Sequence, residues 1–213
     1  MALVKHGQSF KTMAITINGN GTVTGISVGG LPDGIVDTDM LANNAVTASK
    51  ASGSVKGITM HDVWNVSGEF SVPQGENAVT ANWQRFNAIN GVIGSAMTES
   101  SGVFTFPETG IYYIKINANF YDSGANAHNY SGFYIKYTTD NSNYSTKAFS
   151  GSAMDDYSGT TYQFTTCSLT FDVTNVSTHK VRFDTITSGG TMSISGTTAY
   201  NNLWAEFTRL GDT

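Results

Sequence analysis

The sequence predicts an all-β protein, an antiparallel jelly-roll sandwich preceded by a small, extended, turn-rich N-terminal module. From residue 58 onward, apolar side chains recur with a period of two in run after run, as in half-buried strands. Clusters of Gly, Asn, Asp and Ser separate these runs, and no helical pattern interrupts them. Short strands in this number and at this spacing are typical of a sandwich, most often a jelly roll.

The composition is polar but poor in charge. Charged residues make up 13% of the 213 residues, about half of the roughly 25% usual in soluble domains. Gly, Ser, Thr and Asn are plentiful, which is typical of secreted or virion β proteins and argues against a metabolic enzyme. The net charge of −5 provides no basic surface for nucleic acid. The single cysteine, Cys167, excludes an internal disulfide framework.

The first residues, MALVKHGQSFK, lack the apolar segment of a secretory signal. No apolar run approaches the roughly 18 residues of a membrane span, so no membrane insertion is expected. Two localisations fit an exposed protein without an export signal. One is a virion protein, assembled in the host cytoplasm and released by lysis, and the other is an extracellular chain whose signal has been removed.

Residues 1–57 are expected to form the N-terminal module. Ile15 and Ile17 alternate with threonines, Asn-Gly pairs offer a tight turn, and Val23 continues the alternation, which predicts a β-hairpin. An isolated hairpin is only marginally stable in water, so the module should pack against another chain or against another part of this one. The apolar candidates for docking to a larger particle are Ile15, Ile17, Ile35, Val36, Leu41 and Val46. Gly53, Ser54 and Gly57 suggest a linker to the second domain, 58–213.

Part of this module, GIVDTDMLANNAVTASKA at 34–51, resembles a segment found in tail-fibre and other appendage proteins of bacteriophages. The shared phrase is "VDTD-L-NNAVT-K", which precedes a distal domain in those proteins. The resemblance implies attachment to a virion through its capsid, portal or tail.

The second domain is expected to be organised around GVFTFPETGIYYIKINANF at 102–120. This stretch predicts a strand at 103–106, a Pro-Gly turn at 107–110 and a longer strand at 111–120. In the longer strand one face is apolar and should enter the core: Tyr112, Ile114, Ile116 and Ala118. The other strands are expected at 62–70, 84–87, 103–106, 130–138, 161–173, 180–187 and 202–210, with weaker signals at 146–150 and 191–195.

The order RFNAINGVIG, SGVFTFPETGIYYIKINANF, KVRFDTI, NNLWAEFTRL is similar to the globular head of the first complement component, within the tumour-necrosis-factor-like (TNF-like) jelly rolls. The sequence departs from that family at Ile114, where an aromatic is usual, and at Ala205, where Gly is frequent. The resemblance implies a homotrimer in which Tyr113 and Lys115 approach a threefold axis. Alternate residues of the last strand would do the same, namely Leu203, Ala205 and Phe207.

Both faces of that last strand carry bulky apolar groups, so both faces are expected to be buried against other parts of the protein or of a partner. A partner subunit is one way to supply it, and a closing loop is the other.

No motif predicts catalysis, a metal or a cofactor. GISVG at 25–29 matches G-x-S-x-G, but Leu31-Pro32 follow where the nucleophile elbow needs a helix. The four histidines show no zinc-binding spacing. Asp155-Asp156 lies in a Gly/Ser-rich loop, and the sequence leaves open whether it binds Ca²⁺ or is simply solvated. We therefore expect a protein that is not an enzyme.

Tyr144 and Tyr157 flank predicted turns and are the candidates for a surface ligand contact, because aromatic rings stack on sugar rings. Together these features predict a virion structural protein, a homotrimeric phage fibre or spike. Its N-terminal module would dock to the particle, and its head would bind a glycan or protein on the host surface. The alternatives are a capsid decoration protein without a receptor role and a secreted adhesin of the complement-head type.

Overall fold

The structure is a computed structural model that describes residues 16–17, 23–24, 46, 57–85, 91–124, 128–155 and 158–213. The chain divides into two units, Met1–Ala51 and Ser52–Thr213. The domain boundary expected at residue 57 stays a prediction. No helix among the described residues has the length and apolar character needed to cross a membrane.

The first unit contains the predicted hairpin. Strand β1 (Thr16–Ile17) pairs antiparallel with β2 (Val23–Thr24), and Ile17 lies opposite Val23. Val46, one of the docking candidates, is 60% exposed. Of the other candidates, the structure describes only the backbone of Ile17. The remaining four lie outside the described residues: Ile15, Ile35, Val36 and Leu41.

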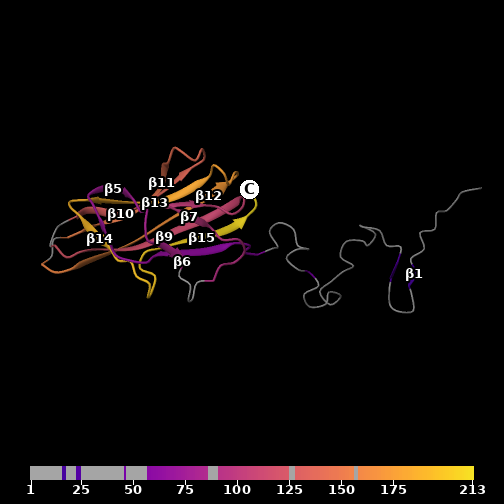
Figure 1. The fold of residues 1–213 in the computed structure, drawn as a ribbon, viewed down its shortest axis with the longest axis horizontal. Coiled ribbons are helices and arrows are strands. Elements are labelled where there is room, and N and C mark those ends of the chain that lie inside the picture. Colours follow the sequence, from indigo (N-terminus) through magenta and orange to yellow (C-terminus); the bar gives the residue numbers. More distant parts are fainter. Residues whose placement is uncertain are drawn as a thin grey trace, which may run out of the picture. The chain divides into compact units, whose positions relative to one another are not determined.

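The second unit is an antiparallel sandwich of two sheets, which confirms the predicted fold class (Figure 1). One sheet, here called the β9 sheet, has the order β4-β14-β9-β15-β3-β6, with β12 on β9. Its strands are β3 (His61–Val66), β4 (Phe70–Val72), β6 (Trp83–Arg85), β9 (Gly110–Asp122), β12 (Thr161–Val173), β14 (Met192–Ile194) and β15 (Trp204–Gly211). The other sheet, the β10 sheet, has the order β11-β10-β13-β8-β7, with β5 on β13. Its strands are β5 (Gly75–Ala78), β7 (Thr98–Ser100), β8 (Val103–Thr105), β10 (His128–Thr138), β11 (Ser145–Met154) and β13 (Lys180–Ser188).

Strand β9 is the centre of its sheet, as expected from its length and alternation. It pairs with β12, with β15 and, at its far end, with β14. The predicted core face is buried: Tyr112, Ile114, Ile116 and Ala118 are at most 2% exposed. The turn before β9 carries the chain from the β10 sheet to the β9 sheet. Gly110 in that turn has φ +149°, and a Cβ there would lie 2.6 Å from the carbonyl oxygen of Gly211, so the close approach requires glycine.

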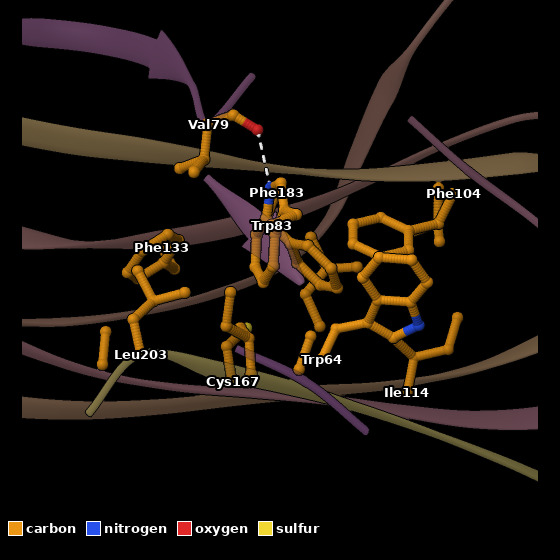
Figure 2. Close-up of a cluster of buried hydrophobic side chains, with 14 of the residues drawn as sticks. Trp64, Val79, Trp83, Phe104, Ile114, Phe133, Cys167, Phe183 and Leu203 are labelled. Atoms are coloured by element: carbon orange, nitrogen blue, oxygen red, sulfur yellow. Dashed lines mark hydrogen bonds between the residues drawn. The ribbon is translucent and has the colours of Figure 1, made fainter. Parts of the chain in front are cut away.

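The core between the sheets is built around aromatic rings (Figure 2). Phe104 of β8 is fully buried, and its ring centroid lies 5.0 Å from that of Phe207. The rings of Trp64 and Trp83 meet Phe104 edge to face, with centroids at 5.5 and 5.1 Å. Trp83 Nε1 donates a hydrogen bond of 2.9 Å to the carbonyl oxygen of Val79, drawn as a dashed line in Figure 2. Aromatic contacts therefore join both sheets.

The sequence did not predict β4, β5 and β7, which have only three or four residues each. Such short strands are defined by the partners that pair with them, not by an alternation of their own. The strand expected at 62–70 ends at Val66, because the next backbone N–H, that of Ser67, donates to the carbonyl oxygen of Asn82 in a loop. Strand β11 is longer than the weak signal at 146–150 suggested.

The stability of the second unit is expected to fall between pH 10 and pH 12 because of Tyr112. Burial, followed by the charge of Glu108, raises the pKa of Tyr112 from 10.0 to about 12. The unfolded chain loses this proton first, so stability is fully present below pH 10 and is lost as pH rises toward 12. One pKa unit is worth about 1.4 kcal/mol, and the folded-state hydroxyl group is half ionised at pH 12, so we expect a loss of about 2 kcal/mol from this group by pH 12.

Denaturant titrations of the wild type and of Tyr112→Phe at pH 9 and pH 12 would measure this loss. The variant lacks the hydroxyl group and its 2.9 Å hydrogen bond to the carbonyl oxygen of Glu108 at every pH. It should therefore be less stable at pH 9 but lose less stability on going to pH 12. Equal losses in both proteins would contradict the assignment to Tyr112.

Candidate functional site

The outward face of the β9 sheet is the main candidate site. Because Tyr112, Ile114 and Ile116 enter the core, Tyr113 and Lys115 point outward, and both are partly exposed. Their cross-strand neighbours on this face come from β12 and β15: Thr170 and Thr208 beside Tyr113, Ser168 and Glu206 beside Lys115. The face predicted for these two residues is thus correct, whereas their approach to a threefold axis stays a prediction.

The predicted axial residues of the last strand were wrong. Leu203, Ala205 and Phe207 are all 0% exposed within the single chain and belong to its core. The register explains this, because Ala205 lies opposite Ile116 and Phe207 opposite Ile114, both core residues of β9. The outward residues of β15 are instead Trp204 and Glu206.

Two exposed aromatic side chains stand at the β12 edge of this face. Phe164 is 75% exposed and Tyr162 is 59% exposed. The ring of Tyr162 lies 5.8 Å from that of Tyr121, its neighbour on β9. Single exposed apolar residues are ordinary, but aromatic groups gathered on one sheet face are typical of an interaction surface.

A hollow of about 200 Å³ lies next to Phe164. Its floor and rim include Asn117, Thr166, Asn201, Asn202 and Trp204. Lys115 Nζ lies 5.3 Å from the ring centroid of Trp204, a cation–π contact across the same face.

Several amide groups near this hollow are not satisfied. Thr166 Oγ1 donates a 2.5 Å hydrogen bond to Asn117 Oδ1, but Asn117 Nδ2 has no hydrogen-bond partner within the described ranges. The same holds for Asn201 Oδ1 and Asn119 Oδ1, and all three atoms are buried. Buried polar atoms without partners cost free energy, so this face is suited to a partner that brings hydrogen-bonding groups.

The outward face of the β10 sheet carries Tyr144, one of the predicted ligand contacts. Tyr144 is partly buried, and its ring lies 4.5 Å from Arg182 Cζ. Burial raises the pKa of Tyr144. Tyr157 lies outside the described residues. The proposed contact surface therefore has one described member, packed on a guanidinium group that the sequence analysis did not single out.

The structure describes Asp155 as exposed but does not describe Asp156. No group of three or more potential metal ligands occurs in the described ranges. A buried pair that the sequence analysis missed joins His128 and Asp122, whose Nε2 and Oδ2 atoms are 2.8 Å apart. Nothing in the local sequence indicates this contact, because it depends on the ends of β9 and β10 meeting.

No protein-family model matches the sequence, and no curated protein matches it. Among solved structures, Eiger TNF from S. frugiperda is similar, with 12% identity and a TM-score of 0.53 over 73% of this chain and 94% of that one. Murine APRIL at pH 5.0 is 13% identical, with a TM-score of 0.49 over 70% of this chain and 99% of that one. Identity at this level is informative about fold alone. The chain therefore has a TNF-like jelly-roll fold.

Proposed function

We propose that this protein is a virion structural protein, a homotrimeric appendage of a bacteriophage particle. Its second unit assembles through the outward face of the β9 sheet. Its first unit docks to a capsid, portal or tail protein, and its remaining surface meets the host cell. The proposed role is structural and adhesive, with no catalytic step.

One observation carries the assembly part of the proposal. Phe164 and Tyr162 are exposed on the same face that holds buried amide atoms, and these amide atoms have no hydrogen-bond partner in the part of the chain that the structure describes. Water satisfies exposed polar groups at no cost, but it does not reach these amides. A second copy of the chain covers the aromatic rings, and its polar groups pair with these amides when the amide side chains turn outward on contact. Phe164 also lines the hollow, so the rings and the hollow form one continuous surface. In a trimer this surface meets a different surface of the neighbouring copy, a contact that closes into a ring when the rotation permits.

The particle part of the proposal rests on the first unit. The phage-like phrase at 34–51 and the exposed Val46 support a docking role for this unit. Immunogold labelling of purified particles with antibody against the full chain should mark an appendage. Particles that never carry the label would contradict this part of the proposal.

The assembly part is tested by the solution mass of the full chain, measured by light scattering over a range of concentrations. We expect three times the chain mass of 22.7 kDa. Phe164→Ser should shift the mass toward that of one chain, because it removes the most exposed aromatic group of the face.

Phe149→Ser is the matched control, because Phe149 is also an exposed phenylalanine but lies on the β10 sheet. It should leave the trimer intact. A wild-type mass of one chain at every concentration would contradict self-assembly. An equal response of the two variants would show that the β9 face is not the interface.

A further inference from the structure

The outward face of the β10 sheet carries a second cluster, here called the charged patch: Glu76, Lys136, Tyr144, Phe149, Arg182 and Asp184. Lys136 of β10 lies opposite Arg182 of β13, and Asp184 lies opposite Tyr134. Since Ile135 and Phe183 between them are core residues, these charged side chains leave the sheet on its outer side. The charged patch is therefore separate from the proposed assembly face, which belongs to the other sheet (Figure 1).

A network of ion pairs occupies the middle of the charged patch. Lys136 Nζ donates to the carboxylate of Glu76 and lies 3.4 Å from Asp184 Oδ2. Arg182 Nη2 donates a 2.9 Å hydrogen bond to the same Asp184 oxygen. Asp184 is only 1% exposed although it lies on the outside of a sheet, so neighbouring side chains cover it.

This network leaves one acceptor and one donor unused. Asp184 Oδ1 and Arg182 Nε are both buried, and neither has a hydrogen-bond partner among the residues that the structure describes. Leaving a buried carboxylate oxygen without a donor is costly, more so than for a neutral group. Both atoms lie under neighbouring side chains, so a ligand hydroxyl group, which donates one hydrogen bond and accepts another, pairs with either of them only when those side chains move aside.

Aromatic rings border the network on the side of β11. The Tyr144 ring lies against the Arg182 guanidinium. The Phe149 ring is packed 5.1 Å from that of Tyr134, yet Phe149 remains 50% exposed. An exposed apolar ring next to hydrogen-bonding groups fits a ligand with one apolar face and polar edges.

The turn that carries Tyr144 is held in place by Asp140. The Asp140 carboxylate accepts hydrogen bonds from the backbone N–H groups of Ser142 and Asn143, at 2.9 and 2.7 Å. It also accepts one from Asn143 Nδ2 at 2.7 Å, and these bonds, with that from Thr138 Oγ1, lower the pKa of Asp140. A turn fixed in this way presents Tyr144 in one position, which reduces the entropy lost on binding.

The charges of the patch select the class of ligand. Glu76 and Asp184 offset Lys136 and Arg182, so the network is neutral as a whole, which disfavours an anion or a cation as the main ligand. From these contacts we propose that the charged patch binds a neutral carbohydrate. Sugar hydroxyl groups bond to the guanidinium group of Arg182, whose side chain is 30% exposed, and one face of the pyranose ring stacks on Phe149. This inference rests on the proposed function, because it names the class of ligand that the protein would contact on the host surface. Three copies of the site in one trimer would bind together and raise the overall affinity.

Saturation-transfer NMR on the full chain tests the site, with galactose, glucose and N-acetylglucosamine as neutral probes. N-acetylneuraminic acid and glucosamine are the charged probes for comparison. We expect at least one neutral sugar to bind, and both charged sugars to bind more weakly than it does.

Phe149→Ala and Arg182→Gln should each lower the affinity for that sugar about tenfold, the loss typical of a contact that matters in a binding site. The control is Tyr200→Ala, which removes an aromatic side chain that is 60% exposed but lies in the loop before β15. It should bind as the wild type does. Thermal unfolding of each variant shows whether a loss of sugar affinity is due only to unfolding of the protein. Phe149 is exposed, so Phe149→Ala should fold and keeps the test valid if Arg182→Gln does not fold.

Three results would overturn the site. These are no transfer to any neutral sugar, stronger binding of a charged sugar, and binding that survives Phe149→Ala unchanged. The solution mass of the same samples separates this inference from the proposed function. Sugar binding by a protein with the mass of one chain would support the sugar site and contradict the trimer. A trimer that binds no sugar would support the proposed assembly and contradict the sugar site.

Discussion

Replacing Phe104 by alanine is expected to lower the free energy of unfolding of the second unit by about 3–5 kcal/mol, the range for truncating a buried phenylalanine. Phe104 is fully buried, and its ring contacts those of Trp64, Trp83, Phe183 and Phe207, with centroids between 5.0 and 5.5 Å. These rings come from both sheets. They cannot all move into the space that alanine would leave, so most of the cavity should persist.

Denaturant titration measures this loss, and two further variants define it. Phe104→Leu should lose less, because it keeps most of the buried volume. Phe149→Ala removes a phenylalanine that is 50% exposed but packs on Tyr134, and should lower stability by only about 1 kcal/mol. If Phe104→Ala and Phe149→Ala lost equal stability, the aromatic cluster would not be the centre of the core.

Replacing Asp62 by alanine is expected to cost about 3 kcal/mol. This carboxylate is 0% exposed and accepts hydrogen bonds from Trp64 Nε1 at 3.0 Å and from the backbone N–H of Met97 at 2.9 Å. It also pairs with the Arg85 guanidinium at 3.2 Å. Alanine would leave all of these donors unsatisfied, and the penalty for breaking a buried pair is about 3–5 kcal/mol. The Arg85 side chain is 33% exposed, so water offsets part of the loss and the lower end is expected.

Thermal and denaturant unfolding of Asp62→Ala should be compared with that of Asp172→Ala. Asp172 lies on the exposed outer side of β12, so its removal should change stability by about 0.5 kcal/mol or less. A loss from Asp62→Ala no larger than that of the control would mean that Asp62 is not needed to hold β3, β6 and the segment before β7 together.

The long strands were predictable because their alternation is a local property. Strands β9, β12 and β13 lie within two residues of the expected bounds at each end. In β9 one face is apolar and the other mostly polar, so the period of two is plain in the sequence. In β12 the C-terminal half alternates in the same way, whereas Tyr162 and Phe164 are exposed and the polar Gln163 and Thr165 are buried. Strand β5 has the sequence GENA, which contains no such pattern, and it is held by pairing with β13.

The candidate site was predicted only in part, and for a related reason. Tyr113 and Lys115 were placed on the outward face correctly because their neighbours Tyr112, Ile114 and Ile116 form an unambiguous apolar row. Strand β15 gave no such contrast, since Trp204 on one face is as bulky as Phe207 on the other. A shift of one residue reverses the two faces of a strand, which is how Leu203, Ala205 and Phe207 were assigned to the surface.

By itself the sequence determined the all-β class, the positions of the long strands and the inward face of β9, because periodicity and turn residues act over a few neighbouring residues. The tertiary structure alone decided which face of β15 is buried, because that depends on its register against β9. It also decided that Lys136 and Arg182 meet across two strands, and that Asn117 lies beside Trp204. Pairing between distant segments sets these contacts, and no local pattern records which segments will pair.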